Sequence, residues 1–277
     1  MPKAFSLAGD DRTVEPLETS LPMMPMPDSA DATELAWTSA DAKGRGIFGF
    51  DSLDPRSRSF NLIRAKLLQL QSERGWRLIG IVSATPNVGK SFIAANVAAS
   101  LSRIPRRQTC AVDLDLRRAS LSALFGLEPN RGVRRYLEEE KPEALPEIYR
   151  MEGERLLIMP TRAAPIHSAE MLAGDNAQML FRSMRYSGNS RLFIVDLPPV
   201  FANDDAVATL ARLDCYILVA EEGKTKQREI LDSVALLGRE RLAGVVLNKY
   251  RGGIMSEGYG VESYYASGYD GAAPEAE

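Results

Sequence analysis

The sequence has few of the residues that disulfide scaffolds, histidine-rich metal sites or membrane spans require. Only two of its 277 residues are cysteines, Cys110 and Cys215, and both lie in apolar runs, which indicates small core residues in a reducing compartment. The one histidine, His167, is expected to be a loop residue, because a metal site needs several ligands. No apolar run reaches the roughly 20 residues of a membrane-spanning helix, and the first residues do not look like a secretory signal. We therefore expect a cytoplasmic protein that does not insert into a membrane.

The sequence also has little excess of either charge: it carries 34 basic and 37 acidic side chains, and the formal net charge is −3. A nucleic-acid-binding protein usually has a basic surplus, so no nucleic-acid partner is expected. The first residues differ from the rest: residues 1–43 carry eight acidic and only three basic side chains, and five prolines fall within the first 27 residues. Low hydrophobicity with surplus charge predicts a disordered tail over residues 1–45.

Residues 46–250 have the pattern of one folded domain. Continuous apolar runs typical of buried strands alternate with helical periodicity. The predicted strands are 77–83, 109–115, 156–159, 191–199, 214–222 and 242–250, and the predicted helices are 60–70, 91–101, 168–185 and 226–239. This alternation predicts an α/β fold of the P-loop NTPase type, with a mostly parallel sheet and helices on both faces. Residues 251–277, rich in Gly, Ser and Tyr, are predicted to be a flexible tail.

One segment has the pattern of a phosphate-binding loop. The sequence ATPNVGKS runs from Ala84 to Ser91 between a predicted strand and a predicted helix, and it departs from the P-loop pattern only where Ala84 replaces glycine. In such a loop Lys90 reaches the β- and γ-phosphates and the Ser91 hydroxyl binds Mg²⁺. The alternative is a chance turn that ends in Gly-Lys-Ser. The strand before it and the helix after it favour the P-loop, and with it ATP and Mg²⁺ as cofactors.

Three aspartates follow or end other predicted strands. Asp113 and Asp115 are two residues apart, so on an extended strand both would point to the same face and could approach one Mg²⁺–phosphate group. Asp196 ends an apolar run, as does the acid that holds Mg²⁺ in P-loop enzymes. The predicted metal site therefore consists of Ser91, Asp113, Asp115 and Asp196. As an alternative, Asp113 or Asp115 caps the next segment or pairs with Arg117.

A cluster of tyrosines stands near the end of the chain. Tyr259, Tyr264, Tyr265 and Tyr269 fall within eleven residues. The 15 residues from Tyr250 to Tyr265 could span up to about 50 Å, so the tail could enter the active site of a neighbouring molecule. Phosphoryl transfer requires mainly positioning and charge neutralisation, and a tethered acceptor has a high effective concentration. The cluster is therefore predicted to accept phosphate, although a tail without a chemical role stays open.

Several motifs together resemble one family. The order ATPNVGKS, VDLDLRR, IVDLPP, VVLNKY and a tyrosine-rich tail is similar to the bacterial tyrosine kinases (BY-kinases) of capsule and exopolysaccharide biosynthesis, of the cytosolic type. These are relatives of the deviant-Walker ATPases of the MinD/ParA type. The resemblance implies a tyrosine autokinase that regulates polysaccharide polymerisation and export. It also implies a membrane-embedded co-polymerase as activator, which would recruit the protein to the inner face of the membrane. Self-association stays open.

The resemblance also assigns roles to single residues. Asp113 looks like the acid that orients the acceptor hydroxyl or acts as its base, Asp115 and Asp196 would support the metal, and Lys90 would act on the phosphates. Asn248 matches an adenine-contacting position. The implied nucleotide-binding residues are Ala84, Thr85, Pro86, Asn87, Val88, Gly89, Lys90, Ser91, Phe92 and Asn248.

One position distinguishes the sequence from the MinD/ParA ATPases, and three others depart from the usual kinase pattern. Thr85 stands where MinD/ParA ATPases carry an extra lysine, which favours the kinase branch. Asn87 and Val88 replace the Gly and Glu of the usual kinase loop, and Leu197 replaces a threonine. A switch ATPase, or a nucleotide-binding scaffold that controls a polysaccharide-export partner, therefore remains an alternative.

Overall fold

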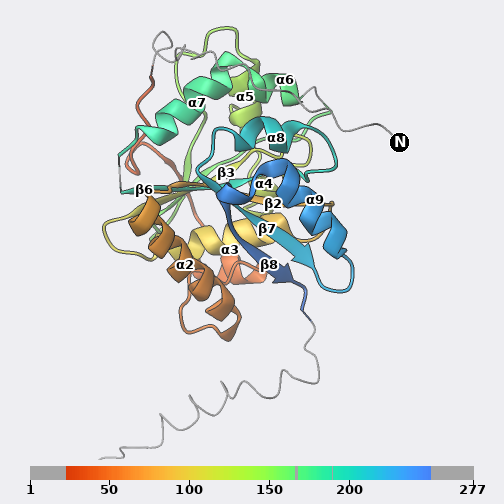
Figure 1. Ribbon diagram of the computed structural model, residues 1–277. Helices are drawn as coiled ribbons and strands as arrows, with labels where there is room; N and C mark the ends of the chain where they lie inside the picture. The colour runs from red at the N-terminus through yellow and green to blue at the C-terminus, as the bar shows by residue number, and fades with distance from the viewer. Residues whose placement is uncertain (1–22, 166–167, 189, 251–277) are drawn as a thin grey trace, which may run out of the picture.

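An eight-stranded, mostly parallel sheet forms the centre of the molecule (Figure 1). The computed structural model describes residues 23–165, 168–188 and 190–250. The strand order is β1-β4-β5-β3-β6-β2-β7-β8, and only the β4–β5 pair is antiparallel. The strands are β1 Thr33–Leu35, β2 Leu78–Ser83, β3 Gln108–Asp113, β4 Tyr149–Met151, β5 Leu156–Met159, β6 Arg191–Asp196, β7 Cys215–Glu221 and β8 Leu242–Asn248. The predicted α/β fold is confirmed.

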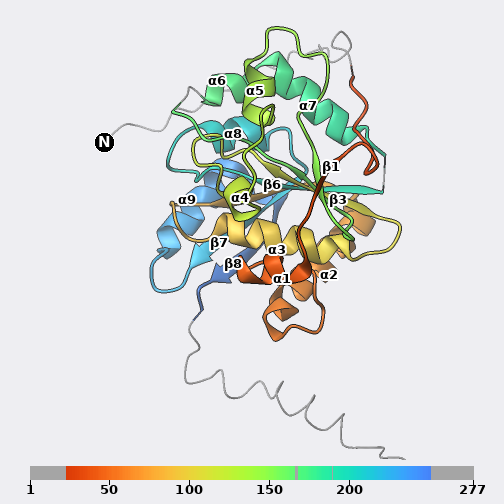
Figure 2. The same ribbon diagram turned by 180° about the vertical axis from the view of Figure 1, so that it is seen from behind.

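Helices cover both faces of this sheet (Figures 1 and 2). They are α1 Ser39–Gly44, α2 Arg58–Arg74, α3 Lys90–Ser102, α4 Ser120–Leu124, α5 Val133–Glu138, α6 Ser168–Ala173, α7 Asp175–Arg185, α8 Asp205–Leu210 and α9 Gln227–Leu237, with short 3-10 turns at Pro55–Ser57 and Arg239–Arg241. Alternate residues of β2 enter two separate cores: Ile79 and Ile81 pack with α1–α4, whereas Leu78 and Val82 pack with α5–α9. This period of two is what a sheet buried on both faces requires.

The expectation of disorder up to residue 45 is wrong for residues 23–45. β1 pairs in parallel with β4, and α1 begins with a capping box between Thr38 and Asp41. Met26 is buried in the core, and Arg191 donates to the Met26 carbonyl and to the Asp28 carboxylate. Buried apolar side chains such as Met26, together with the buried Arg191, fix residues 23–45 to the domain although the composition of this segment is polar. Composition alone does not reveal such contacts.

Most predicted elements are present, with two differences. The predicted helix 168–185 is divided into α6 and α7, because Gly174 has an extended backbone. β3 ends at Asp113, so Asp115 lies beyond the strand and the same-face argument from strand geometry does not hold for it. Cys110 and Cys215 are buried free thiols, as predicted. His167 and the tyrosine-rich residues 251–277 lie outside the described residues.

A buried amide fixes the helix that follows the phosphate loop. Asn96 of α3 is fully buried, and its Oδ1 accepts hydrogen bonds from the main-chain N–H groups of Phe48 and Gly49 at 2.7 and 3.1 Å. Its Nδ2 donates to the carbonyls of Gly46 and Phe92. All four hydrogen-bonding positions of the amide are thus used, which ties the loop before α2 to α3. Among the described residues, no helix combines the length and apolarity needed to cross a membrane.

Candidate functional site: the phosphate loop and its acids

The loop between β2 and α3 opens into a small pocket. The pocket has a volume of about 240 Å³ and is lined by Pro86, Asn87, Gly89, Lys90, Ser91, Phe92, Arg118, Ser120 and Pro199. Gly89, at φ +92°, turns the chain into α3, and a Cβ there would collide with the Asn248 side-chain amide. Glycine is therefore required both by the backbone angle and by this close approach. The pocket lies at the N-terminus of α3, where free N–H groups and the helix dipole favour a phosphate.

The predicted loop residues fall into two groups, apart from Thr85, which is half-buried, does not line the pocket and accepts a hydrogen bond from the Ser83 hydroxyl at its carbonyl. Pro86, Asn87 and Gly89–Phe92 line the pocket. Ala84 and Val88 are each 1% exposed, so their side chains belong to the core, and only their main chain can contribute. The Ala84 carbonyl accepts a hydrogen bond from the N–H of Phe201, which ties the loop to the chain after β6.

Lys90 lies between two aspartates. Its Nζ is 2.7 Å from Oδ2 of Asp115 and 3.6 Å from Oδ1 of Asp196, and the residue is only 7% exposed. Burial by itself lowers the pKa of Lys90, but the attraction of Asp196 and Asp115 outweighs it and the pKa rises. The lysine is therefore a permanent positive charge at the start of α3, suited to the anionic oxygens of a phosphate chain.

Asp196 has the features of a metal ligand. It is fully buried, and neither carboxylate oxygen has a donor in good hydrogen-bonding geometry among the described residues, although Ser91 and Lys90 lie close enough to lower its pKa. Burial raises its pKa, an effect that Lys90 partly offsets. Among the described residues, no group of three or more His, Cys, Asp or Glu side chains is arranged to hold a metal ion. Mg²⁺ usually takes one or two protein oxygens and completes its shell with water and substrate phosphates, so Ser91 and Asp196 fit it.

Asp113 is engaged elsewhere. Its Oδ2 accepts hydrogen bonds from the N–H and the hydroxyl of Ser122, at 2.8 and 2.7 Å, and its Oδ1 accepts from the N–H of Asp115 at 3.2 Å. Burial, and then the nearby Asp196, raise its pKa, whereas Ser122 lowers it. This geometry agrees with the capping alternative. The metal and catalytic roles of Asp113 stay predictions that require its carboxylate to turn away from α4.

Asp115 holds the loop lysine in place. Besides Lys90, its carboxylate accepts a hydrogen bond from the N–H of Arg118. Arg117 forms no ion pair with it or with Asp113 in the described structure; its guanidinium instead lies 3.7 Å from Asp205 and donates to Ser168. The alternative of an ion pair between Arg117 and these two acids is therefore wrong.

Three contacts to the loop were only partly expected. Arg118 donates to the side chain of Asn87 at 2.7 Å, Lys249 donates to the Asn87 carbonyl at 2.8 Å, and Asn248 donates to the Val88 carbonyl at 2.7 Å. Sequence reasoning missed Arg118 and Lys249. Each lies within a motif that it did identify, VDLDLRR and VVLNKY, and this position is the only signal that could have pointed to them. Asn248, expected to contact adenine, here clamps the phosphate loop.

The comparisons with known proteins identify the family of the chain. The family model described as "CobQ/CobB/MinD/ParA nucleotide binding domain" matches residues 79–268. The chain belongs to this family. Proteins of the CobQ/CobB/MinD/ParA family bind a nucleotide, which implies ATP together with a divalent metal as cofactors. The match also confirms the deviant-Walker relationship that the sequence motifs indicate.

The relatives of this family member include several kinases. The chain is 28% identical over 232 residues to the putative tyrosine-protein kinase EpsB of Ralstonia nicotianae, covering 81% of this chain but 30% of EpsB. It is 25% identical to tyrosine-protein kinase YwqD of Bacillus subtilis, covering 69% of this chain and 80% of YwqD. The predicted resemblance to bacterial tyrosine kinases is thus confirmed. Because the chain spans less than a third of EpsB, the activity of that whole protein is not transferred to it.

Solved structures share the fold. The chimerical protein CapA2B2 superposes with a TM-score of 0.66 at 23% identity, covering 83% of this chain and 95% of the other. The kinase domain of the Escherichia coli tyrosine kinase ETK superposes with a TM-score of 0.60 at 23% identity, covering 73% and 80%. At this identity the likeness establishes the common architecture of the CobQ/CobB/MinD/ParA family member and these kinases, and no more.

The clamp by Asn248 gives a first prediction. We expect Asn248→Ala to weaken binding of ADP and of pyrophosphate alike, by about tenfold, because it removes a hydrogen bond that holds the loop main chain. Isothermal calorimetry with both ligands measures this. If Asn248 instead acts through adenine, ADP would bind less tightly and pyrophosphate would bind as well as before. Lys224→Ala, an exposed lysine after β7, serves as the control.

Proposed function

We propose that the protein is an ATP- and Mg²⁺-dependent tyrosine autokinase that phosphorylates its own Tyr259, Tyr264, Tyr265 and Tyr269. It would regulate exopolysaccharide polymerisation and export together with a membrane-embedded co-polymerase that recruits it to the inner face of the membrane. The observation that carries the proposal is the buried pairing of Lys90 with Asp115 and Asp196 at the N-terminus of α3. The named kinases among the relatives support it.

Each residue of the site has a separate task in this proposal. The main chain of the loop, the N-terminus of α3 and Lys90 bind and orient the phosphates. Ser91 and Asp196 would hold Mg²⁺, which supplies charge neutralisation on the phosphates when bound. Asp115 keeps Lys90 directed at the pocket, and Asn248 and Lys249 hold the loop main chain.

One observation favours a second candidate, a MinD/ParA-like switch ATPase or a nucleotide-binding scaffold. Both oxygens of Asp113, the acid assigned to the acceptor hydroxyl, already accept hydrogen bonds from Ser122 and Asp115, so Asp113 presents no unbonded oxygen to such a hydroxyl. A protein without such a base could still bind and hydrolyse ATP, and it could act on its partner by a change of shape.

Mapping of phosphotyrosine tests the proposal. We expect mass spectrometry of protein isolated from its own cell to find phosphotyrosine in residues 251–277, and to find none when Lys90→Met replaces the wild type. Replacement of the four tyrosines by phenylalanine should then impair polysaccharide export. Unmodified wild-type protein, with export intact in the four-fold variant, would contradict the kinase and favour the switch ATPase.

A further inference from the structure

Arg118 lines the phosphate pocket but has no task in the proposed function. It follows β3, and Lys90 and Arg118 are the two basic residues among those that line this pocket. The Nη1 of Arg118 donates to the side-chain oxygen of Asn87 at 2.7 Å, and Asn87 belongs to the phosphate loop itself. The exposed guanidinium therefore lies against the loop, beside the space that would receive the phosphates.

The two cations of this pocket differ in what surrounds them. Lys90 lies within 4.0 Å of the carboxylates of Asp115 and Asp196, which offset its charge. The guanidinium of Arg118 meets a neutral amide instead, and among the described residues no carboxylate lies within 4.0 Å of it. One hydrogen bond uses one of the five N–H donors of an arginine, so both charge and donors remain for an anion.

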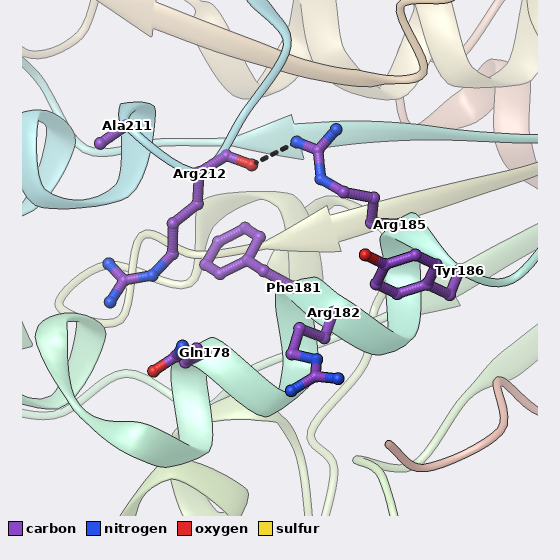
Figure 3. A pocket seen from close by; sticks show the side chains of 7 residues that line it. All are labelled: Gln178, Phe181, Arg182, Arg185, Tyr186, Ala211 and Arg212. Carbon is purple, nitrogen blue, oxygen red and sulfur yellow. Dashed lines mark hydrogen bonds between the residues drawn. The ribbon is translucent and has the colours of Figure 1, made fainter. Parts of the chain in front are cut away.

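A larger pocket on α7 offers no comparable group. It has a volume of about 420 Å³, and Arg182, Arg185 and Arg212 are among the residues that line it (Figure 3). Arg185 forms an ion pair with Asp214 at 2.7 Å, and the guanidinium groups of Arg182 and Arg212 point apart in Figure 3. Because these cations do not converge on one anion, we assign no ligand to this pocket.

The chain around the contact between Arg118 and Asn87 has unusual backbone conformations. Of the four non-glycine residues with positive φ in the described part of the chain, three lie in or next to the phosphate loop: Asn87 at +66°, Ala119 at +50° and Lys249 at +56°. Such conformations persist only where surrounding contacts fix them. Here the N–H of Arg118 donates to the carboxylate and the carbonyl of Asp115, and Lys249 donates to the Asn87 carbonyl. The guanidinium and its amide partner are thus preorganised.

The place of Arg118 in the fold points to the terminal phosphate of the nucleotide. Arg118 follows β3, which pairs with β6 as far as Asp196. It therefore approaches the phosphate chain from the side of the expected metal ligand. In P-loop enzymes the metal bridges oxygens of the β- and γ-phosphates, so the γ-phosphate lies on this side.

From these contacts we infer that Arg118 binds the γ-phosphate of ATP and that Asn87 positions Arg118 for this contact. The inference rests on the nucleotide site of the proposed function, but not on tyrosine as the phosphate acceptor. The contact contributes to a preference for ATP over ADP, which a kinase and a switch ATPase both need because each must release ADP. Asn87, which replaces the glycine of the usual kinase loop, then has a role as the support of this arginine.

Comparison of two nucleotides tests the inference. Isothermal calorimetry on the full chain with Mg²⁺ measures the affinities for AMP-PNP, which has a γ-phosphate, and for ADP, which has none. We expect the ratio of the AMP-PNP affinity to the ADP affinity to fall by about tenfold or more in Arg118→Gln, as expected for loss of a charge-assisted hydrogen bond. Arg228→Gln, on the exposed surface of α9, is the matched control and should keep the wild-type ratio.

A second variant separates positioning from charge. Asn87→Gly removes the amide that accepts from Arg118, and glycine adopts a φ of +66° without strain, so the loop keeps its path. The same affinity ratio should fall by roughly threefold to fivefold, less than in Arg118→Gln, because the guanidinium keeps its charge but loses its preorganised position. An unchanged ratio in Asn87→Gly would overturn the positioning role of Asn87.

Other outcomes would overturn the contact with the γ-phosphate. They are an unchanged ratio in Arg118→Gln and an equal loss of affinity for both nucleotides, which would assign Arg118 to the structure of the loop. A wild type that does not bind ADP would overturn the proposed nucleotide site, and this contact with it. Protein that passes the calorimetric test but carries no phosphotyrosine would contradict the kinase and leave the contact standing, so the two proposals fail separately.

Discussion

Lys90→Met is expected to lower phosphoryl transfer by roughly 100- to 1,000-fold, the loss that follows removal of one preorganised charge from a transition state. Lys90 is the only group of the site that carries a full positive charge within 4.0 Å of Asp115 and Asp196 among the described residues. Methionine keeps most of the side-chain volume but neither the charge nor the N–H donors. Incorporation of labelled phosphate into the protein, measured at saturating ATP and Mg²⁺, gives the rate.

The same substitution leaves two buried carboxylates without their cation, so its effect on folding is measured separately. Thermal unfolding should show a lower Tm for Lys90→Met. Lys90→Arg retains the charge and should unfold close to the wild type, yet remain strongly impaired in phosphoryl transfer because the guanidinium is larger and planar. Lys224→Met, at an exposed position, controls for loss of a lysine. Phosphoryl transfer above a tenth of the wild-type rate in both Lys90 variants would show that this lysine is not in the catalytic site.

Asp196→Asn is expected to separate metal binding from stability. The carboxylate is fully buried, so removal of its charge relieves a desolvation cost. The same change removes the attraction between Asp196 and Lys90, whose Nζ lies 3.6 Å from the carboxylate. These effects oppose each other, and Lys90 keeps Asp115 as its partner. We therefore expect the free energy of unfolding to change by well under the roughly 3–5 kcal/mol that loss of one partner of an isolated buried ion pair costs.

Nucleotide binding should respond very differently. In the presence of Mg²⁺ the affinity of Asp196→Asn for ADP should fall by roughly 100-fold, because an amide is a poorer ligand than a carboxylate for a hard cation. With EDTA, the variant and the wild type should bind ADP about equally. Ser91→Ala is a second test of the same metal site and should show the same dependence on Mg²⁺. A loss of affinity that persists in EDTA would assign Asp196 to loop structure instead of metal binding.

Continuous apolar strands and the loop motif made much of the architecture predictable. The run before Ala84, the helix after Gly89 and the apolar run ending at Asp196 each have a local signature, and all three lie where they were expected. The short elements α4, α5, α8 and β4 have three to six residues each and were not predicted. Elements of this length depend on tertiary contacts more than on their own periodicity.

The site was predictable in its residues but not in their partners. Both Asp113 and Asp115 lie beside the phosphate loop, yet the first caps α4 and the second holds Lys90. Ser122, which binds Asp113, is nine residues away and belongs to a helix without a sequence signal. A pair of carboxylates two residues apart shows that acids gather at this strand end. Which hydrogen-bond donors they meet depends on the path of the chain afterwards.

The pairing of β1 with β4 has a consequence for where the folded unit begins. Residues 33–35 form the outermost strand next to β4, and Met26 fills part of the core, although both precede the family match that starts at residue 79. A shortened protein that started at residue 46 would leave the N–H and C=O groups of β4 open to strands of other molecules, the usual route to aggregation through a sheet edge. Recombinant versions of this domain should therefore retain the chain from residue 23 onward.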